Sequence, residues 1–189
     1  MKKNKSNQIA TIAIFFAVMI VINILSSIIF NILPVPIKPT IVHIPVIIAS
    51  IIYGPRVGAC LGALMGLMSM THNTIIRLPT SYLFSPFVEN GNVYSIIIAV
   101  VPRILIGITP YFIYKWIKNR KGLFIAGAVG SMTNTIFVLG GIFFVFSSVF
   151  DGNIQAMLAT VLGTNSIAEM IISSVLTAAL VPTLQKIQK

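Results

Sequence analysis

Long apolar runs separated by short polar breaks dominate the chain. A helix that crosses a bilayer needs about 20 mainly apolar residues. The runs therefore predict six membrane-spanning helices, at roughly 8–31, 42–53, 57–71, 93–116, 123–149 and 156–184. Several prolines close together are incompatible with a helix interior, so the proline-rich stretch "ILPVPIKPTIVH" ends the first helix. The polar, aromatic and proline-broken residues 72–92 predict a long loop.

The second and third predicted helices are shorter than the others and are joined by the tight turn "GPR". One interpretation is a tilted pair, or a pair in a thin membrane, in which both helices cross. The other is that one of the two does not cross squarely and helps to line a cavity. The sequence leaves both interpretations open.

The distribution of charge predicts the orientation. If six helices alternate in direction, all but three of the 13 Lys and Arg residues fall on the side that holds both termini. The opposite side receives Lys38 and Arg77, together with Glu89 and Asp151. Basic residues are enriched in cytoplasmic loops. We therefore expect both termini in the cytoplasm.

The composition indicates a membrane protein. Hydrophobic residues make up 57% of the chain and charged residues only 8%, with a mean hydropathy of +0.99. Soluble domains carry about 25% charged residues, and a surface this poor in charge would expose large apolar patches. We expect one all-α integral membrane domain, residues 1–189, with several crossings of the cell membrane. The loops account for the net charge of +10, so no nucleic-acid partner is predicted.

The sequence lacks the signatures of catalysis. The motifs HExxH, GxSxG, CxxC and GxxxxGK[ST] do not occur. The three acidic residues and two histidines show no metal-ligand spacing, and no nucleophile–base pair is recognisable. We expect no catalytic residues, no metal and no cofactor. Transport driven by ATP would need a partner that hydrolyses it.

Two charged residues, Arg103 and Glu169, fall inside predicted membrane helices. A charge within the bilayer is costly, so such residues face protein or water and have a partner. Either the two pair with each other and lock two helices together, or they face a ligand cavity open to the outside. Asn165 lies four residues before Glu169, on the same helix face, where both can receive hydroxyl or amide groups of a solute. Asn134, on the preceding predicted helix, is a deeper candidate, nearer the cytoplasmic half.

Taken together, these features resemble the S component of energy-coupling factor (ECF) vitamin transporters, which is their substrate-binding membrane subunit. The likeness covers nearly the whole chain. It includes the small residues Ala10, Ala13 and Ala17 in the first predicted helix, of which the last two form an AxxxA pattern. The more specific signals are the turn "GPRVGACLGALMG" and the stretch "FSPFVENGNVYSIIIAVVPRILIGITPYFIYK".

The resemblance implies a role and partners. An S component binds a vitamin or precursor from outside with high affinity and docks on the membrane subunit EcfT, whose two ATPase subunits supply the energy. The docking face would be Ala13 and Ala17, with Ala10 beside them. The ligand pocket would lie near the outer face, with Asn165 and Glu169 among its contacts and the loop 32–43 as its lid.

The stretch around Arg103 is most similar to the pantothenate-specific branch. This implies a ligand carboxylate on Arg103 or Arg77, because charge-assisted arginine–carboxylate pairing is a strong polar contact. Branches for riboflavin, folate and hydroxymethylpyrimidine share the scaffold. Aromatic residues such as Tyr82 and Phe84 would suit a ring, or an interfacial aromatic belt. A structural membrane protein locked by Arg103 and Glu169 is the alternative from a different class.

Overall fold

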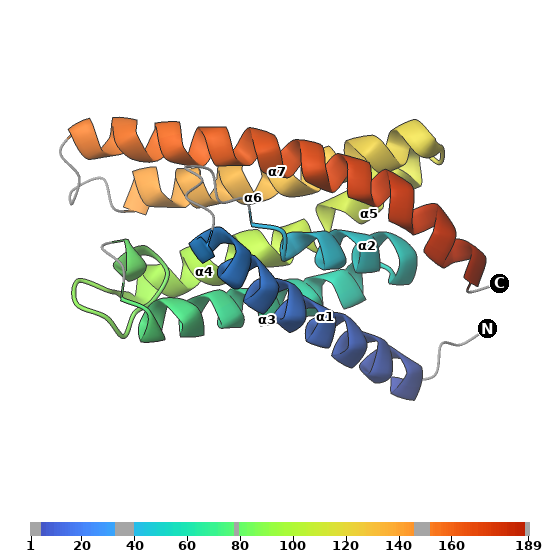
Figure 1. Cartoon of the computed structure of the whole chain (residues 1–189), viewed down its shortest axis with the longest axis horizontal. Helices are drawn as coiled ribbons and strands as arrows, with labels where there is room; N and C mark the ends of the chain where they lie inside the picture. The colour runs from blue at the N-terminus through green and yellow to red at the C-terminus, as the bar shows by residue number, and fades with distance from the viewer. Residues whose placement is uncertain (1–4, 33–39, 78–79, 146–151, 188–189) are drawn as a thin grey trace.

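The computed structural model describes residues 5–32, 40–77, 80–145 and 152–187 (Figure 1). Within these ranges the protein is helical and contains no strand. The elements are α1 (Lys5–Ile32), α2 (His43–Tyr53), α3 (Pro55–Ile75), the short 3-10 helix η1 (Ser81–Leu83), α4 (Val93–Ile106), α5 (Thr109–Trp116), α6 (Arg120–Val145) and α7 (Gly152–Ile187).

Each of the six predicted segments contains helix. Among the described residues, four helical stretches are long and apolar enough to cross a membrane: Ser6–Ile29, Val93–Trp116, Arg120–Phe144 and Asn165–Ile187.

The predicted helix 93–116 has the bounds of the apolar stretch Val93–Trp116, but it is interrupted at Gly107 and Ile108, between α4 and α5. Pro110 lies in the first turn of α5, a position that proline favours because no helical N–H is needed there. The predicted loop 72–92 begins too early, since α3 continues to Ile75.

The short helix α2 lies inside the bundle, and it begins partway along the bundle's length (Figure 1). Every side chain from His43 to Ile51 is buried, as expected of a helix that is apolar on all sides. It packs against α3, α5, α6 and α7. Its 11 residues extend roughly 16 Å, about half the thickness of a bilayer core. Of the two interpretations of the short segments, this favours a helix that does not cross by itself.

Glycines bring α3 and α4 into backbone contact. A Cβ added to Gly62 would lie 2.1 Å from the carbonyl oxygen of Arg103, and one added to Gly58 would lie 2.0 Å from that of Gly107. Gly66 makes a similar approach to Ala99. Because the three α3 glycines are four residues apart, they form one face without side chains. This face sets the position of α4, and with it the position of Arg103.

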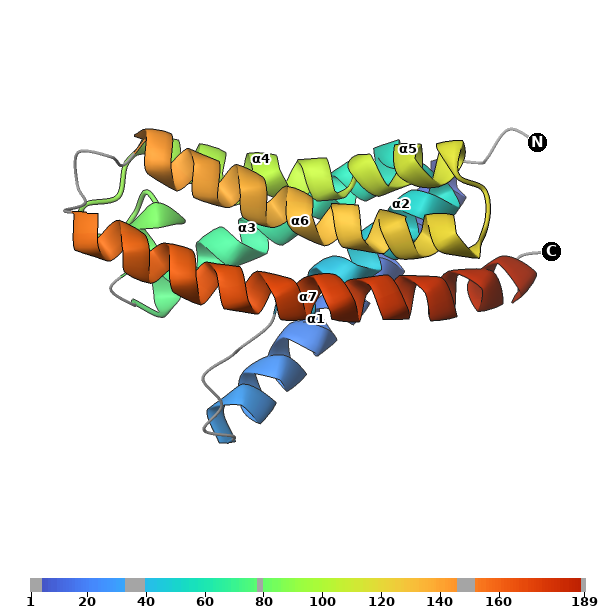
Figure 2. The same ribbon diagram turned by 90° about the horizontal axis from the view of Figure 1, so that it is seen from above.

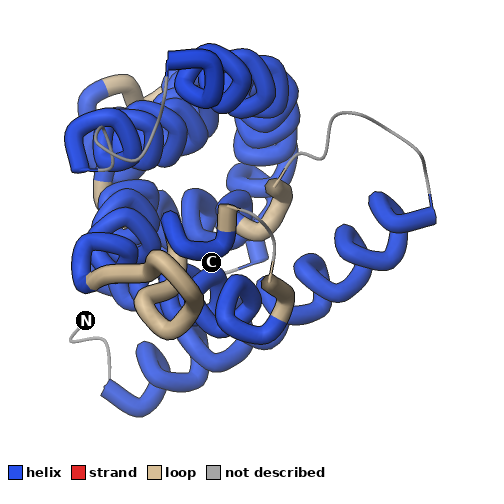
Figure 3. Tube along the Cα trace, turned by 90° about the vertical axis from the view of Figure 1, so that its left-hand side faces the viewer, coloured by secondary structure: helices blue, strands red, loops and turns tan. Residues whose placement is uncertain are grey.

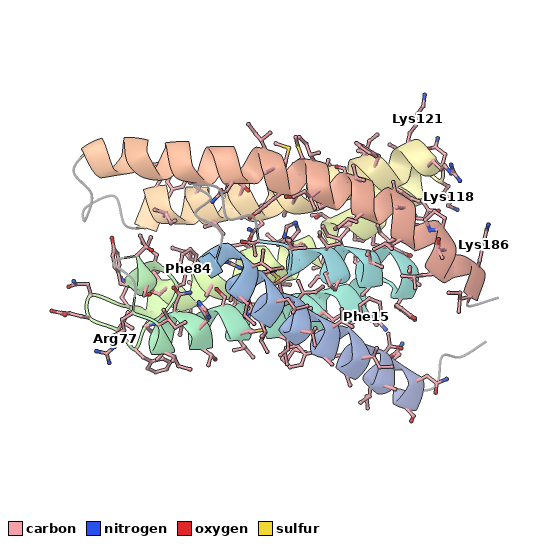
Figure 4. All side chains as sticks on the ribbon, viewed as in Figure 1. Phe15, Arg77, Phe84, Lys118, Lys121 and Lys186 are labelled. Atoms are coloured by element: carbon pink, nitrogen blue, oxygen red, sulfur yellow. The ribbon has the colours of Figure 1, made fainter. Side chains whose placement is uncertain are left out.

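Basic side chains gather at one end of the bundle. Lys118, Lys121 and Lys186 project from this end, whereas Arg77 lies at the other (Figure 4). The N-terminal end of α1 and the C-terminal end of α7 also lie at the basic end (Figure 1). These three lysines and Arg77 thus lie at opposite ends of the bundle (Figure 4), as the charge pattern predicted.

Candidate functional site

A cavity of about 360 Å³ lies between the helices. Its lining residues come from α1 (Asn23), α3 (Met65, Met68, Ser69, His72, Asn73), α4 (Arg103), α6 (Asn134, Thr135, Val138, Leu139), α7 (Asn165, Ser166, Glu169) and the segments before α2 and α4 (Thr40, Val42, Thr80, Phe84). Most of these side chains are polar, and they converge on the cavity together with a few apolar ones, an arrangement that suits a small polar ligand.

Arg103 lies beside a proline in the interior of α4. Pro102 has no N–H, so the Ile98 carbonyl four residues earlier receives no helical hydrogen bond from it. The Arg103 side chain supplies a donor instead, because its Nη1 donates to the Ile98 carbonyl oxygen at 2.8 Å. The bond turns the guanidinium back along α4 and fixes it at the cavity.

The Arg103 guanidinium retains capacity to bind an anion. The residue is 8% exposed, and its Cζ lies 5.2 Å from the centroid of the Phe84 ring, within cation–π range. Its Nε is buried and has no hydrogen-bond partner in the described part of the chain. A guanidinium carries five N–H donors and can bind a carboxylate through two of them.

Glu169 of α7 is 7% exposed and lines the same cavity. Its Oε1 accepts a hydrogen bond from the backbone N–H of Thr40 at 2.6 Å, which connects α7 to the segment before α2. Glu169 and Arg103 attract each other electrostatically. Between these two described residues, however, no nitrogen–oxygen distance is as short as the 4.0 Å of an ion pair. The structure therefore does not contain the ion-pair lock that was one of the two interpretations.

Helices α6 and α7 each contribute an amide to the cavity. The side-chain oxygens of Asn134 and Asn165 are buried, and neither has a hydrogen-bond partner among the described residues. The hydroxyls of Thr135 and Ser166 are hydrogen-bonded across the two helices, next to these amides. Asn134 of α6 and Asn165 of α7 thus line the same cavity.

The remaining two candidate residues, Arg77 and Tyr82, lie outside the cavity lining. Arg77 follows the last turn of α3 and is exposed. Tyr82 of η1 packs on an apolar cluster, and its carbonyl accepts a hydrogen bond from Ser95 Oγ at 2.5 Å. Partial burial raises the pKa of the Tyr82 phenol above its usual value.

A polar stripe on α3 went unrecognised in the sequence. Ser69, His72 and Asn73 line the cavity together with Met65 and Met68. These positions recur at three- and four-residue intervals, which places them on one helix face. The signal was hidden because the predicted loop began at residue 72. Asn23 was also missed, although it is a lone amide in the apolar run of α1.

The two histidines lie in different surroundings. His43 is 1% exposed in the first turn of α2, inside the bundle, with the Thr40 backbone as a polar neighbour. His72 lies in the final turn of α3 and contributes to the cavity. The position of His72 follows from the continuation of α3 beyond residue 71, where the hydropathy pattern predicted its end.

Comparison with known proteins identifies the architecture. The model of the family described as "ECF transporter, substrate-specific component" matches residues 7–181. The chain belongs to this family. The ECF substrate-specific components are transport subunits rather than enzymes, in agreement with the apolar helices.

Two relatives match nearly the whole chain. The protein named pantothenic acid transporter PanT from Lactococcus lactis subsp. cremoris is 45% identical over 191 residues, which cover 98% of this chain and 97% of the relative. The protein named pantothenate transporter PanT from Leuconostoc mesenteroides is 28% identical over 201 residues, which cover 95% of this chain and 93% of the relative.

Proposed function

We propose that this ECF substrate-specific component binds pantothenate in the cavity, with the carboxylate on Arg103. The observation that carries the proposal is a set of three buried polar atoms. Arg103 Nε, Asn134 Oδ1 and Asn165 Oδ1 have no hydrogen-bond partner among the described residues, and all three residues line the cavity. An unpartnered buried polar group is costly and rare in native proteins. A ligand that accepts from the guanidinium and donates to both amides would satisfy all three.

Pantothenate carries the matching groups. Its carboxylate can accept from Arg103, and its amide N–H and hydroxyls can donate to Asn134, Asn165 and Glu169. Its dimethyl-substituted carbon suits the apolar wall that includes Val138 and Leu139. The carboxylate and the hydrogen-bond donors of the ligand therefore have counterparts in the cavity.

The cavity is less suited to the other ligands considered. Small-molecule pockets usually measure about 300–1,000 Å³, so a volume of about 360 Å³ favours a compact vitamin over riboflavin or folate. Phe84 is the aromatic residue that lines the cavity within the described part of the chain, whereas Phe87 and Tyr94 are exposed. A neutral hydroxymethylpyrimidine has no carboxylate to accept hydrogen bonds from Arg103. The names of the two relatives support the same ligand.

Energy for transport would come from partners. We assign this role to EcfT and two ATPase subunits, as the family implies. Ala10, Ala13 and Ala17 are exposed on α1. Small residues three and four apart leave a strip on which another helix can lie closely. These alanines are therefore the proposed contact with EcfT.

The proposed orientation places the basic end of the bundle in the cytoplasm. Lys118, Lys121 and Lys186 would then face the cytoplasm, as the positive-inside rule expects, with both termini on that side (Figure 4). The cavity, bounded in part by the outer turns of α3, would open toward the outside of the plasma membrane. We propose six helical segments within the membrane, of which the second contains the short buried helix α2.

Calorimetric titration of the purified protein with pantothenate, riboflavin, folate and a hydroxymethylpyrimidine tests the ligand. We expect heat from pantothenate alone, with a dissociation constant in the nanomolar range. Binding of another vitamin instead would keep the transport role and overturn the ligand. Folded protein that binds none of the four would contradict the assignment of the cavity as their site.

A further inference from the structure

Helix α1 is the least buried of the four apolar stretches. It packs on α2 and α3, and Met19 is its fully buried side chain. The C-terminal end of α1 stands away from the other helices (Figures 2 and 3). The side chains of Ile24 and Ile28 are 54% and 51% exposed there.

Asn23 lies between the buried Met19 and the C-terminal end of α1. It follows Met19 by four residues, so both lie on the face of α1 that points inward. Asn23 lines the cavity and makes no hydrogen bond with the described part of the chain. An amide in an otherwise apolar membrane helix is costly unless it meets a polar partner. The cavity is where Asn23 can find one.

The other walls of the cavity belong to the body of the bundle. Ser69 of α3, Arg103 of α4 and Glu169 of α7 line it together with Asn23. A solute in the cavity is therefore placed between α1 and three helices that pack tightly on their neighbours. A hydrogen bond from the solute to Asn23 adds a contact between α1 and the bundle that the empty cavity does not provide.

We infer that Asn23 is a ligand contact, and that a bound solute fixes α1 against the bundle through it. This inference rests on the proposed function of the cavity. It adds to that proposal a specificity-determining residue on α1 and a physical consequence of binding. Occupancy of the cavity restricts the movement of α1 relative to the bundle, because the solute supplies a polar partner that Asn23 does not have among the described residues.

The first test is the affinity for pantothenate. Asn23→Ala is expected to raise the dissociation constant roughly tenfold, the effect of one lost hydrogen bond. Asn23→Gln, which keeps the amide, is expected to recover part of the loss. Ser27→Ala is the matched control, because Ser27 lies one turn farther along α1 and does not line the cavity. Thermal unfolding without ligand shows whether each variant folds.

The second test measures how widely the position of α1 varies relative to α7. Cys60 is replaced by Ala, and spin labels are attached at Ile28→Cys on α1 and Ile167→Cys on α7, both exposed positions. In a lipid nanodisc, saturating pantothenate is expected to narrow the distribution of distances between the labels. With Ser27→Ala, pantothenate is expected still to narrow the distance distribution. With Asn23→Ala, the distribution is expected to stay broad, even at a pantothenate concentration that saturates this variant.

The outcomes separate the two proposals. If the unsubstituted protein binds pantothenate and Asn23→Ala changes neither the affinity nor the narrowing, the inference about Asn23 is wrong and the proposed function stands. If the unsubstituted protein is folded and does not bind pantothenate, the proposed function fails, and the inference fails with it. A loss of affinity with unchanged narrowing would overturn the coupling to α1.

Discussion

Pro102 and Arg103 act together on α4. The proline lacks the N–H that the Ile98 carbonyl would otherwise accept, and Arg103 Nη1 donates to that carbonyl at 2.8 Å. An arginine side chain is long and flexible, so this bond restricts its conformation before any ligand arrives. The Nε remains buried without a partner in the described part of the chain. The pair thus explains how a membrane helix holds a guanidinium ready for an anion.

Pro102→Ala tests this relationship. The new N–H would donate to the Ile98 carbonyl and release the guanidinium. We expect thermal stability to hold or rise, because proline in a helix interior costs about 3 kcal/mol relative to alanine. The dissociation constant for pantothenate should rise about three- to tenfold, as Arg103 loses its fixed position. Pro110→Ala, in the first turn of α5, is the control and should leave affinity unchanged. An unchanged affinity for Pro102→Ala would refute the positioning role.

Gly62→Ala should disrupt the contact between α3 and α4. The added Cβ would lie 2.1 Å from the Arg103 carbonyl oxygen, so the helices must separate. We expect a loss of about 2 kcal/mol or more in stability, as for other overpacked sites, and weaker ligand binding. Gly140→Ala is the matched control, because its added Cβ meets nothing within 4 Å. Thermal unfolding of both variants measures the difference, and equal effects would contradict the close packing.

Glu169→Gln separates the charge of this residue from its hydrogen bonding. Gln keeps an acceptor oxygen for the Thr40 N–H and for a ligand hydroxyl, and it removes the negative charge that attracts Arg103. Stability without ligand should fall, since the Arg103 charge then has less compensation, while the affinity for pantothenate changes less than about threefold. Glu169→Ala also removes the acceptor and should weaken binding about tenfold or more. Equal losses for the two variants, measured by calorimetry, would show that the charge itself is required.

Ala13→Trp tests the docking face. The indole would cover the strip of small residues on α1 and keep a partner helix from approaching. Co-purification with EcfT and the ATPase subunits should be lost, whereas pantothenate binding by the isolated chain should be unchanged. Ile14→Trp, at an exposed neighbouring position, is the control and should leave the complex intact. An intact complex with Ala13→Trp would contradict the assignment.

The sequence predicted those features of the fold and site that depend on local pattern. Hydropathy located a helix in each of the six segments, and the four-residue spacing of Asn165 and Glu169 placed both on the face of α7 that lines the cavity. Arg103 was identified because a charged residue inside a membrane helix is costly and needs a polar partner. In each case the physical signal lies within one helix and needs no knowledge of its neighbours.

Other features depend on how the helices pack, and the sequence alone did not predict them. Hydropathy marks the loss of apolar character at residue 72, but α3 continues because its polar turn faces the cavity rather than lipid. The shared cavity of Asn134 and Asn165 depends on the packing of α6 against α7. Tyr82 is oriented by the apolar cluster beneath η1, which only the fold assembles. The Pro102–Arg103 pairing was readable from the sequence, but the acceptor of the guanidinium was not.

The most direct measurement compares pantothenate with pantothenyl alcohol, its uncharged analogue, on the unsubstituted protein and on Arg103→Gln. A charge-assisted contact is worth roughly 1.5–3 kcal/mol, so the unsubstituted protein should prefer pantothenate by about ten- to a hundredfold. In folded Arg103→Gln the preference should disappear, because the variant has no guanidinium for the carboxylate. If Arg103→Gln keeps the full preference, the carboxylate is bound elsewhere and the central claim is wrong.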